Sequence, residues 1–492
     1  MFTRSDENLT MLFDFYEMTM SHGYFEHGMK DLIGYFDMYY RSNPDNGGFA
    51  IACGLDSVID YLNDLRFDPE DIDFLRSKGI FKEDFLTWLA DFRFSGDVWA
   101  VPEGSVVFPN EPLITVRAPI IEASLVETMI LLSMNHQSCI ASKASRIVRA
   151  ARGRAIMEFG SRRAQGPDAA NLGARAAYIA GCVGTADTLA DQRWGVPALG
   201  TMAHSWVMMF SSELDAFKAY AESYPDNCLL LVDTYDTLAS GVPNAIRTFD
   251  EVLTPMGKRP AGIRLDSGDI AYLSKQARRM LDEAGYPDAK IVASNALDEY
   301  RISDILQQEA RLDSFGVGEN LITSKSDPVF GGVYKLVAVE KDGEIFPKIK
   351  ISENVEKITT PGFKHFCRFY NKDHKALADL ILLKDEPLPD GSPYEIFHPT
   401  YTWKRMVLED YEVRPMHKEI FRAGKLVYDR PSLPEIRDYC QKEIASLWDE
   451  YLRFDNPHIY KVDLSREIWD MKHQLLTEVK AQAVSVIRNP ME

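Results

Sequence analysis

The 492-residue sequence lacks the marks of several large protein classes. Its six cysteines form no C-x-x-C pair, so neither a zinc site nor a disulfide framework is indicated. Residues 1–20 carry acids and polar groups where a signal peptide needs an apolar run, and no uncharged apolar run approaches the roughly 18 residues of a membrane span. Net positive charge is absent as well, because the chain carries −19, and this opposes nucleic-acid binding. We therefore expect a reduced, cytoplasmic, soluble protein that binds neither nucleic acid nor a membrane.

Common catalytic motifs are also missing. The sequence contains no GxxxxGK(S/T) phosphate loop, no HExxH zinc motif and no GxSxG nucleophile motif. The ten histidines are scattered along the chain, so a histidine-rich metal site is not indicated either. These absences argue against three familiar types of active site: those of P-loop enzymes, zinc proteases and α/β-hydrolases.

One segment contrasts with the acidic composition. Residues 141–163 hold seven lysine or arginine side chains and one acid, Glu158. Because most runs of charge form solvated faces, one interpretation is an exposed basic surface. The other interpretation is an anion held nearby, and charge alone does not decide between them. The seven cations are Lys143, Arg146, Arg149, Arg152, Arg154, Arg162 and Arg163.

Short apolar runs alternate with helical patterns from about residue 150 onward. Amphipathic patterns typical of helices occupy 212–223 and 270–285. Strands that alternate with helices predict βαβ units and a parallel sheet. The number of strands favours an irregular parallel α/β barrel, with an open doubly wound sheet as the alternative. The predicted strands are 154–159, 177–183, 196–203, 228–236, 261–269, 290–298, 313–320 and 333–340.

The flanking regions have a different character. Residues 1–140 mix helical stretches with strand-like pieces, and their Pro and Gly residues predict a separate mixed α/β domain. Residues 346–492 begin with a β-rich stretch and end in a helical region rich in aromatics. We therefore predict three parts. They are an N-terminal mixed domain (1–140), a barrel with a catalytic rim (141–345), and a C-terminal β-rich and helical region that packs on the first two (346–492).

The strand ends carry the residues suited to chemistry. Ligands of α/β barrels and open α/β sheets bind at the carboxyl ends of the strands, where this chain has arginines, carboxylates, glycines and one histidine. This set suits a phosphorylated sugar, because arginines bind phosphate oxygens bidentately and a glycine-rich turn such as 316–323 presents N–H groups to a terminal phosphate. Asp233, Asp236 and Asp266 would accept hydrogen bonds from ribose hydroxyls or orient hydrated magnesium, although helix capping explains such residues about as well.

His204 follows a strand end at Gly200 and Thr201, within the stretch VPALGTMAHSW. A lone histidine is more often structural than catalytic, but strand-end loops carry function in this architecture. Its chemistry there would be that of a general base, a phosphate ligand or a nucleophile. The physics of the sequence alone does not choose among the three.

Over essentially its whole length the chain resembles the bacterial nicotinate phosphoribosyltransferases, in the group that includes the animal enzymes. The segments FGSRRAQGPD and GTMAHSW are specific motifs of that family, and both occur here in order. The further matching segments are DFYEMTMSHGY, FDMYYRSNPDNGGFAIACGL, IRLDSGD, GGVYKLVAV and NPHIYKVDLSREIWDMK.

The resemblance implies ATP-coupled transfer of the 5-phosphoribosyl group from 5-phosphoribosyl 1-diphosphate to nicotinate. The products would be nicotinate mononucleotide and diphosphate, in the first step of NAD salvage from nicotinate. The resemblance also implies that His204 is the nucleophile toward the ATP γ-phosphate, forming a phosphohistidine. Tyr16, Thr201 and Arg264 would contact nicotinate, and Thr323 would contact the sugar phosphate. The further predicted site residues are Arg162 and Arg163 for the diphosphate, Asp266 beside Arg264 in catalysis, and Gly316 and Gly318 in the phosphate turn.

The same resemblance implies a homodimer in which Tyr16 reaches the partner's site. Magnesium would be carried by the diphosphate, with Asp233 and Asp236 as candidate contacts and no direct protein ligands. Two alternatives stay open at this point. A nicotinamide phosphoribosyltransferase would favour a carboxylate near the amide nitrogen, and a non-catalytic sugar-phosphate sensor would keep the fold without the reaction.

Overall fold

The structure is a computed structural model that describes residues 8–354 and 357–488, with side chains to residue 479. The chain forms two compact units. Residues up to Cys139 and from Val329 onward build the first unit, and Ile140–Pro328 build the second. Helix α6 (Glu127–Ala150) contributes residues to both.

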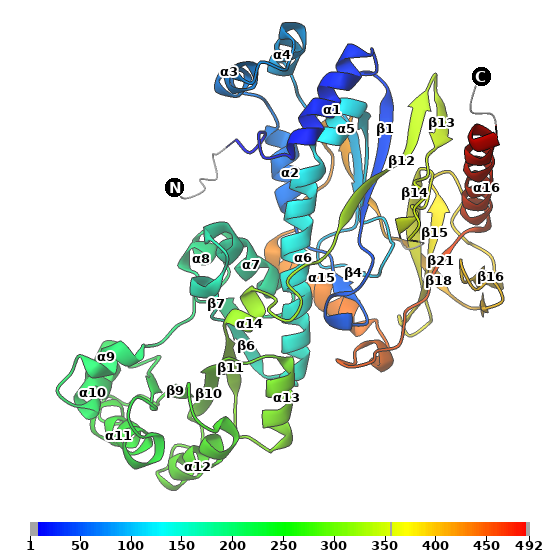
Figure 1. The fold of residues 1–492 in the computed structure, drawn as a ribbon. Coiled ribbons are helices and arrows are strands. Elements are labelled where there is room, and N and C mark those ends of the chain that lie inside the picture. The colour runs from blue at the N-terminus through cyan, green and yellow to red at the C-terminus, as the bar shows by residue number, and fades with distance from the viewer. Residues whose placement is uncertain (1–7, 355–356, 489–492) are drawn as a thin grey trace. The chain divides into compact units, whose positions relative to one another are not determined.

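The second unit is built on a layer of parallel strands (Figure 1). Every pair in this layer runs parallel, in the order β7-β6-β11-β10-β9-β8. The prediction of an α/β fold with a parallel sheet is confirmed. Strands β7 and β8 end the layer on either side and are not paired with each other among the described residues, so closure into an irregular barrel stays a prediction. Their bounds are β6 (Ala155–Glu158), β7 (Gly184–Thr185), β8 (Leu229–Leu231), β9 (Gly262–Leu265), β10 (Lys290–Asn295) and β11 (Ser314–Val317).

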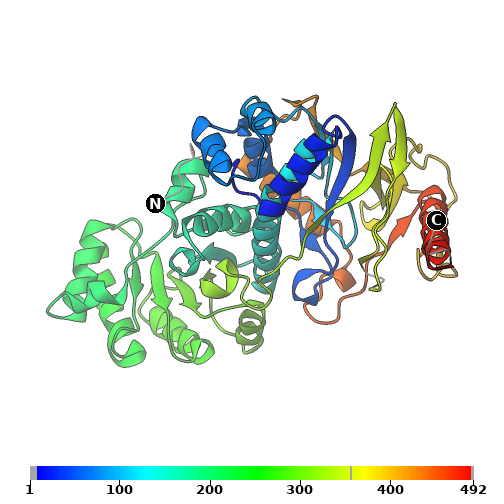
Figure 2. The same cartoon turned by 45° about the horizontal axis from the view of Figure 1, so that its top comes forward.

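Helices connect the strands, and in both views the green helices of this unit lie around its strands (Figures 1 and 2). In α12 the side chain of Asp269 caps the helix by accepting the N–H of Tyr272. Ile270, Ala277 and Leu281 then form a buried face at helical spacing. The helices are α7 (Pro167–Ile179), α8 (Thr188–Trp194), α9 (His204–Met208), α10 (Glu213–Ser223), α11 (Val242–Thr248), α12 (Ile270–Glu283), α13 (Glu299–Gln307) and α14 (Glu319–Ile322).

Three predicted strands differ from the structure. Residues 177–179 end helix α7, in which Pro167 supplies a favourable first position and small alanines bury the inner face. Residues 196–203 form only a single bridge, between Thr185 and Ala198. Strand β12 (Val333–Lys341) pairs antiparallel with β1 (Ile33–Tyr39) in the first unit, because an apolar run does not itself specify which strand it pairs with. The three-part division of the chain stays a prediction.

The first unit contains a seven-stranded antiparallel sheet in the order β13-β12-β1-β5-β3-β19-β20 and a four-stranded sheet in the order β18-β14-β15-β21. Its hydrophobic core includes Met38, Val116 and Phe421 from the larger sheet. The remaining strands are β2 (Ala50–Ile51), β3 (Asp97–Ala100), β4 (Val106–Val107), β5 (Ile114–Pro119), β13 (Glu344–Pro347), β14 (Lys364–Tyr370), β15 (Ala376–Leu383), β16 (Tyr394–Phe397), β17 (Arg405–Leu408), β18 (Glu412–Pro415), β19 (Lys418–Arg422), β20 (Lys425–Leu426) and β21 (Val462–Leu464).

A buried group of charges joins the four-stranded sheet to a helix of the same unit. Arg368 on β14 is fully buried, and its Nη2 lies 2.7 Å from Oδ2 of Asp379 on β15. Its Nη1 lies 3.2 Å from Oε2 of Glu443 on α15. We call Arg368, Asp379 and Glu443 the sealed ion cluster. The helices of this unit are α1 (Phe15–Glu26), α2 (Leu55–Asp64), α3 (Pro69–Ser77), α4 (Glu83–Ala90), α5 (Ile120–Leu125), α15 (Leu433–Ala445) and α16 (Arg466–Arg488).

Candidate active site

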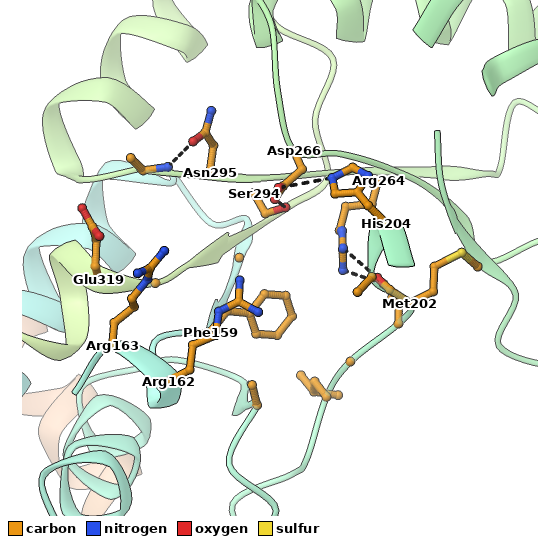
Figure 3. A pocket seen from close by; sticks show the side chains of 18 residues that line it. Phe159, Arg162, Arg163, Met202, His204, Arg264, Asp266, Ser294, Asn295 and Glu319 are labelled. Carbon is orange, nitrogen blue, oxygen red and sulfur yellow. Dashed lines mark hydrogen bonds and ion pairs between the residues drawn. The ribbon is translucent and has the colours of Figure 1, made fainter. Parts of the chain in front are cut away.

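A cavity of about 490 Å³ lies at the carboxyl ends of the parallel strands of the second unit (Figure 3). Segments that follow β6, β7, β9, β10 and β11 form its wall, which is where ligands of α/β barrels bind. The structure therefore brings together most of the residues that the sequence predicts for the site. Those that line the cavity are Arg162, Arg163, Thr201, His204, Arg264, Asp266, Gly316 and Gly318.

Two arginines enter the cavity from the turn after β6. Gly160 caps the short turn Ser161–Arg163, because its carbonyl accepts the N–H of Arg163 at 2.7 Å. Arg162 and Arg163 project into the cavity from one wall, across from Arg264 (Figure 3). Two adjacent guanidinium groups match the geometry of phosphate oxygens. This turn is therefore suited to a diphosphate.

The ring of Phe159, which follows β6, lies against Gly316 on the adjacent strand β11. Phe159 lines the cavity, and a Cβ placed on Gly316 would lie 2.4 Å from its Cδ2 atom. A side chain at position 316 would therefore displace the ring. The absence of that side chain lets Phe159 form part of the wall, where it offers a flat apolar face to a ligand.

His204 begins helix α9 and keeps 40% of its side chain exposed. Its Nδ1 lies 3.1 Å from the hydroxyl oxygen of Thr234. On the other side of the ring, Nε2 lies 3.8 Å from Oδ2 of Asp266 and 4.0 Å from Oδ1 of Asp233. Nearby carboxylates stabilise positive charge on an imidazole. The ring is thus open to the cavity and placed to gain charge during a reaction.

Arg264 on β9 holds the segment that leads to His204. Its Nη1 donates to the hydroxyl oxygen of Thr201 at 2.6 Å, and its Nη2 donates to the carbonyl of Met202 at 2.8 Å. Its Nε is buried and has no hydrogen-bond partner within the described part of the chain. Burial lowers the pKa of Arg264, while the charge of Asp266 acts in the opposite direction. An anion bound in the cavity would supply negative charge to this partly desolvated cation.

The three predicted carboxylates have different surroundings. Asp266 has 40% of its side chain exposed and accepts a hydrogen bond from the hydroxyl of Ser294. Asp233 is buried, and its Oδ2 accepts the N–H of Asp266 at 2.8 Å. Asp236 accepts two backbone N–H groups at the start of the turn 237–241, so it acts as a cap. Asp266 is the member of the three that both lines the cavity and is open to a ligand.

Two further predicted residues, Thr323 and Tyr16, are also not among those of the cavity wall. The hydroxyl of Thr323 donates to the carbonyl of Glu319 at 2.7 Å, just after α14. Glu319 itself lines the cavity and pairs with Lys325 at 2.7 Å, which lowers the pKa of this carboxyl. Tyr16 belongs to α1 in the first unit and is 45% exposed, and burial together with Glu127 raises the pKa of its hydroxyl. The roles predicted for Thr323 and Tyr16 stay predictions.

Neither interpretation of the basic segment 141–163 holds for all of it. Lys143 and Arg146 are buried on α6, where Glu299 lies 2.8 Å from Lys143 and 2.7 Å from Arg146. The prediction of a solvated face is therefore wrong for these two residues. The other end of the segment, with Arg162 and Arg163, lines the cavity.

The sequence reasoning assigned no role to several residues of the wall. Phe159, Ser294 and Asn295 lie in predicted strand-end segments, so the same positional signal applies to them. Asn295 also has a φ of +137°, a backbone conformation that non-glycine residues rarely adopt. Ala186 follows β7, and it was missed because that strand was expected at 177–183.

Two classes of feature are absent from the described residues. No group of three or more His, Cys, Asp or Glu side chains there is arranged to hold a metal ion. Within the same residues, every helix is too short or too polar to cross a bilayer. The six cysteines are buried and unbridged.

Comparison with known proteins identifies the family. Residues 11–135 match the nicotinate phosphoribosyltransferase N-terminal domain, 154–374 match the nicotinate phosphoribosyltransferase (NAPRTase) family, and 363–472 match its C-terminal domain. The nicotinate phosphoribosyltransferase of Bacillus subtilis is 43% identical over 480 residues, which cover 97% of each chain. The crystal structure of human nicotinic acid phosphoribosyltransferase is similar with a TM-score of 0.82 and 28% identity, over 94% of this chain and 99% of that one. The nicotinate-nucleotide pyrophosphorylase of Pyrococcus furiosus, 22% identical over 91% of this chain and 97% of its own, has a similar fold with a TM-score of 0.70. This chain therefore belongs to the nicotinate phosphoribosyltransferase family.

Proposed function

We propose that this chain transfers the 5-phosphoribosyl group of 5-phosphoribosyl 1-diphosphate to nicotinate, coupled to ATP hydrolysis. The products are nicotinate mononucleotide and diphosphate, in the first step of NAD salvage from nicotinate. The observation that carries the proposal is the content of the cavity. It combines paired arginines, Arg162 and Arg163, with a partly buried arginine, Arg264, and an open histidine, His204. The names of the Bacillus and human relatives support the transfer of a phosphoribosyl group to nicotinate.

In the transfer step the pyridine nitrogen of nicotinate forms a bond to C1′ of the ribose while the bond from C1′ to the diphosphate oxygen breaks. The nitrogen brings its own lone pair, so no side chain has to remove a proton. The work of the protein is to align the two reactants and to stabilise the leaving group. Arg162 and Arg163 carry the charge that the departing diphosphate requires.

Nicotinate is a flat ring with one carboxylate, and the cavity has a counterpart for each part. Arg264 provides the cation for the carboxylate, supported by its partial burial and its unpartnered Nε. Thr201 lies 2.6 Å from Arg264 and provides a neighbouring hydroxyl. Phe159 provides the face on which the ring rests.

His204 takes the γ-phosphoryl group of ATP. A ring nitrogen forms a bond to phosphorus, the bond from phosphorus to the ADP oxygen breaks, and ADP leaves. Asp233 and Asp266 lie within 4.0 Å of Nε2 and stabilise the positive charge that the ring acquires. The phosphoryl group on His204 then adds negative charge at the wall opposite the arginines. Its hydrolysis releases phosphate and restores the imidazole.

Magnesium fits this site as part of the bound diphosphate. The described residues offer no group of three or more acidic, histidine or cysteine side chains for a metal ion, whereas magnesium on a diphosphate needs only one or two carboxylates and water. Asp266 is the exposed carboxylate on the wall and would contact such an ion through water. The ion would neutralise part of the diphosphate charge.

The active form is a cytoplasmic homodimer with shared sites, in which Tyr16 contacts nicotinate bound to the partner. Tyr16 is half-exposed on α1 and sits beside the exposed Phe15 and Leu12. Mixing Tyr16→Ala with His204→Ala homodimers tests the sharing. After verified subunit exchange, ATP-coupled activity should rise above the average of the parents, because one site of each heterodimer receives both wild-type residues. No rise would assign Tyr16 to its own subunit's cavity.

The experiment that tests the reaction measures mononucleotide formation from nicotinate and from nicotinamide, each with and without ATP. We expect nicotinate to be preferred at least about a hundredfold, since an amide leaves the cation of Arg264 unpaired. ATP should raise product formation for the wild type and not for His204→Ala. With γ-labelled ATP, acid-labile and base-stable label should appear on the wild type alone. A preference for nicotinamide would identify the amide-specific enzyme. If 5-phosphoribosyl 1-diphosphate released no diphosphate with either base, the protein would be a sensor.

A further inference from the structure

One buried side chain connects several segments of the cavity wall. Glu158 is the last residue of β6 and is fully buried. One carboxylate oxygen accepts the N–H of Gly160, and the other accepts the hydroxyl of Thr185 at 2.6 Å. Its backbone carbonyl accepts the N–H of Ala186 at 2.8 Å. Glu158 thus ties the turn after β6 to the end of β7.

The first of these links leads to the arginines. Gly160 caps their turn through the N–H of Arg163 at 2.7 Å. Gly160 is also tightly enclosed, because a Cβ at this position would lie 2.6 Å from Cγ2 of Ile322 and 2.7 Å from the carbonyl oxygen of Gly318. The direction in which Arg162 and Arg163 project therefore depends on how Glu158 holds the N–H of Gly160.

The second link leads toward the segment of His204. The N–H of Thr185 donates to the carbonyl of Pro197 at 3.0 Å, and its carbonyl accepts the N–H of Leu199 at 2.8 Å. The hydroxyl oxygen of Thr185 already accepts the N–H of Asp187 at 3.0 Å. The hydroxyl of Thr185 thus donates to Glu158 and accepts from Asp187.

The surroundings of Glu158 oppose its charge. Burial raises the pKa of this carboxyl to about 7, Asp187 acts in the same direction, and the hydrogen bonds from Thr185 and Gly160 act against them. Strands β7 and β11 beside it contain no titratable residue. The charged side chains on the flanking turns are Arg162, Arg163 and Glu319, which line the cavity, and Asp187, which caps α8.

We propose that Glu158 is a positioning residue, whose ionised carboxylate holds the arginine turn and the end of β7 in the geometry that binds the diphosphate of the sugar substrate. The inference rests on the proposed function for the identity of that ligand. An ionised carboxylate accepts from Gly160 and Thr185 together. A protonated carboxyl turns one of these oxygens into a donor, which faces either the N–H of Gly160 or a Thr185 hydroxyl that has to rotate away. Only the ionised form therefore accepts both hydrogen bonds in the arrangement that the structure shows.

The test uses Glu158→Gln, because the amide imitates the protonated carboxyl at every pH. The dissociation constant of 5-phosphoribosyl 1-diphosphate is measured by calorimetry from pH 5.5 to 9. For the wild type we expect it to rise about tenfold as the pH falls through 7, the scale of one hydrogen bond to a charged group. For Glu158→Gln we expect the weak acid-side value throughout.

Thermal melting without ligand separates positioning from a merely structural role. A carboxyl whose pKa is raised by folding favours the folded state at low pH and loses that contribution as the pH rises through 7. Glu158→Gln avoids the buried charge, so it should melt at a higher temperature than the wild type at pH 8.5 and at a similar temperature at pH 5. A residue needed only for structure would lose stability together with binding.

Two further substitutions sharpen the result. Thr185→Val removes a hydrogen bond that favours the charged form, so the binding transition should move to higher pH, whereas Thr185→Ser should restore it. Glu283→Gln, on the exposed face of α12, is the matched control and should change nothing. A wild-type dissociation constant that is independent of pH, or tight binding by Glu158→Gln at pH 8.5, overturns the inference. Failure of the wild type to bind the sugar diphosphate at any pH would instead overturn the proposed function.

Discussion

Arg368 is fully buried and Arg264 is partly buried, yet their hydrogen-bond partners differ. In the sealed ion cluster, Nε and Nη2 of Arg368 donate to Asp379, Nη1 donates to Glu443, and Nη2 also donates to the carbonyl of Val106. Arg264 spends two nitrogens on Thr201 and Met202 and keeps a buried Nε with no partner in the described part of the chain.

The sealed ion cluster and the cavity contain the same residue types, arginines and carboxylates. They differ in how many of the hydrogen-bonding positions of these side chains are already occupied. A buried charge network in which every position is used adds rigidity and offers nothing to a ligand. A cavity whose arginines and carboxylates retain open positions is able to exchange water for substrate. Residue type therefore did not separate the structural charges from those of the candidate site, whereas the hydrogen-bond partners do.

Removing the arginine from the sealed ion cluster should have the largest effect on stability. Arg368→Ala leaves Asp379 buried without its cation and leaves Glu443 with Arg414 alone, which should lower the free energy of unfolding by about 3–5 kcal/mol. Urea denaturation measures this change. A loss below about 1 kcal/mol would show that water reaches the cluster and that it is not sealed. Arg368→Met, which keeps volume, separates lost charge from a cavity.

Arg264→Ala should affect binding more than stability. We expect nicotinate affinity to fall about a hundredfold, or about 2.7 kcal/mol, while the sugar diphosphate loses far less. Calorimetric titration of each ligand separates the two effects. Equal losses would move Arg264 to the diphosphate subsite, and a large drop in unfolding free energy would make it a structural arginine like Arg368.

Acid should act on the first unit through buried histidines. Burial lowers the pKa of His417 to about 3 and that of His365 to about 4. In the unfolded chain these side chains take up protons near pH 6.5, so folding is favoured above that pH and the advantage is lost as the pH falls. Each histidine should contribute a slope approaching about 1.4 kcal/mol per pH unit below pH 6.

Denaturation at pH 7, 6 and 5 measures that slope. His417→Gln should reduce the slope by the contribution of one histidine, because one proton fewer is taken up on unfolding. An unchanged slope would mean that His417 is already charged in the folded protein.

The smallest effect should come from an exposed pair. Arg405 and Glu395 lie 2.7 Å apart on β17 and β16, with about half of each side chain exposed. Arg405→Ala should change the free energy of unfolding by less than about 1 kcal/mol, because solvent already screens the pair. This variant is the control for Arg368→Ala. If both variants lost a similar free energy of unfolding, burial would not determine how much an ion pair contributes to stability.

Much of the site followed from strand-end positions in the sequence. His204, Arg264 and Asp266 lie where the end of a parallel strand was expected, and the family motifs marked the turn of Arg162 and Arg163. The convergence of Arg264 and Asp266 follows from parallel strands that present their carboxyl ends on one side, whereas His204 follows a segment with a single bridge.

Other features depend on contacts between distant segments. The run at 333–340 reads like one more barrel strand, yet β12 pairs with β1, about 300 residues earlier, and nothing within the run encodes that partner. Glu158 was counted as the lone acid of a basic segment. Its hydrogen bond from Thr185 comes from the neighbouring strand β7, which the apolar pattern places at 177–183.

The close approach of Gly316 to the Phe159 ring has a consequence for how this family can change. Any replacement at position 316 adds a Cβ that would lie only 2.4 Å from Cδ2 of Phe159. The two positions are therefore coupled, and their substitutions will not be additive. A side chain at 316 has to displace the ring, and a smaller residue at 159 would remove that clash. A substitution at 316 alone should therefore destabilise the protein more than the same substitution made together with a smaller residue at 159.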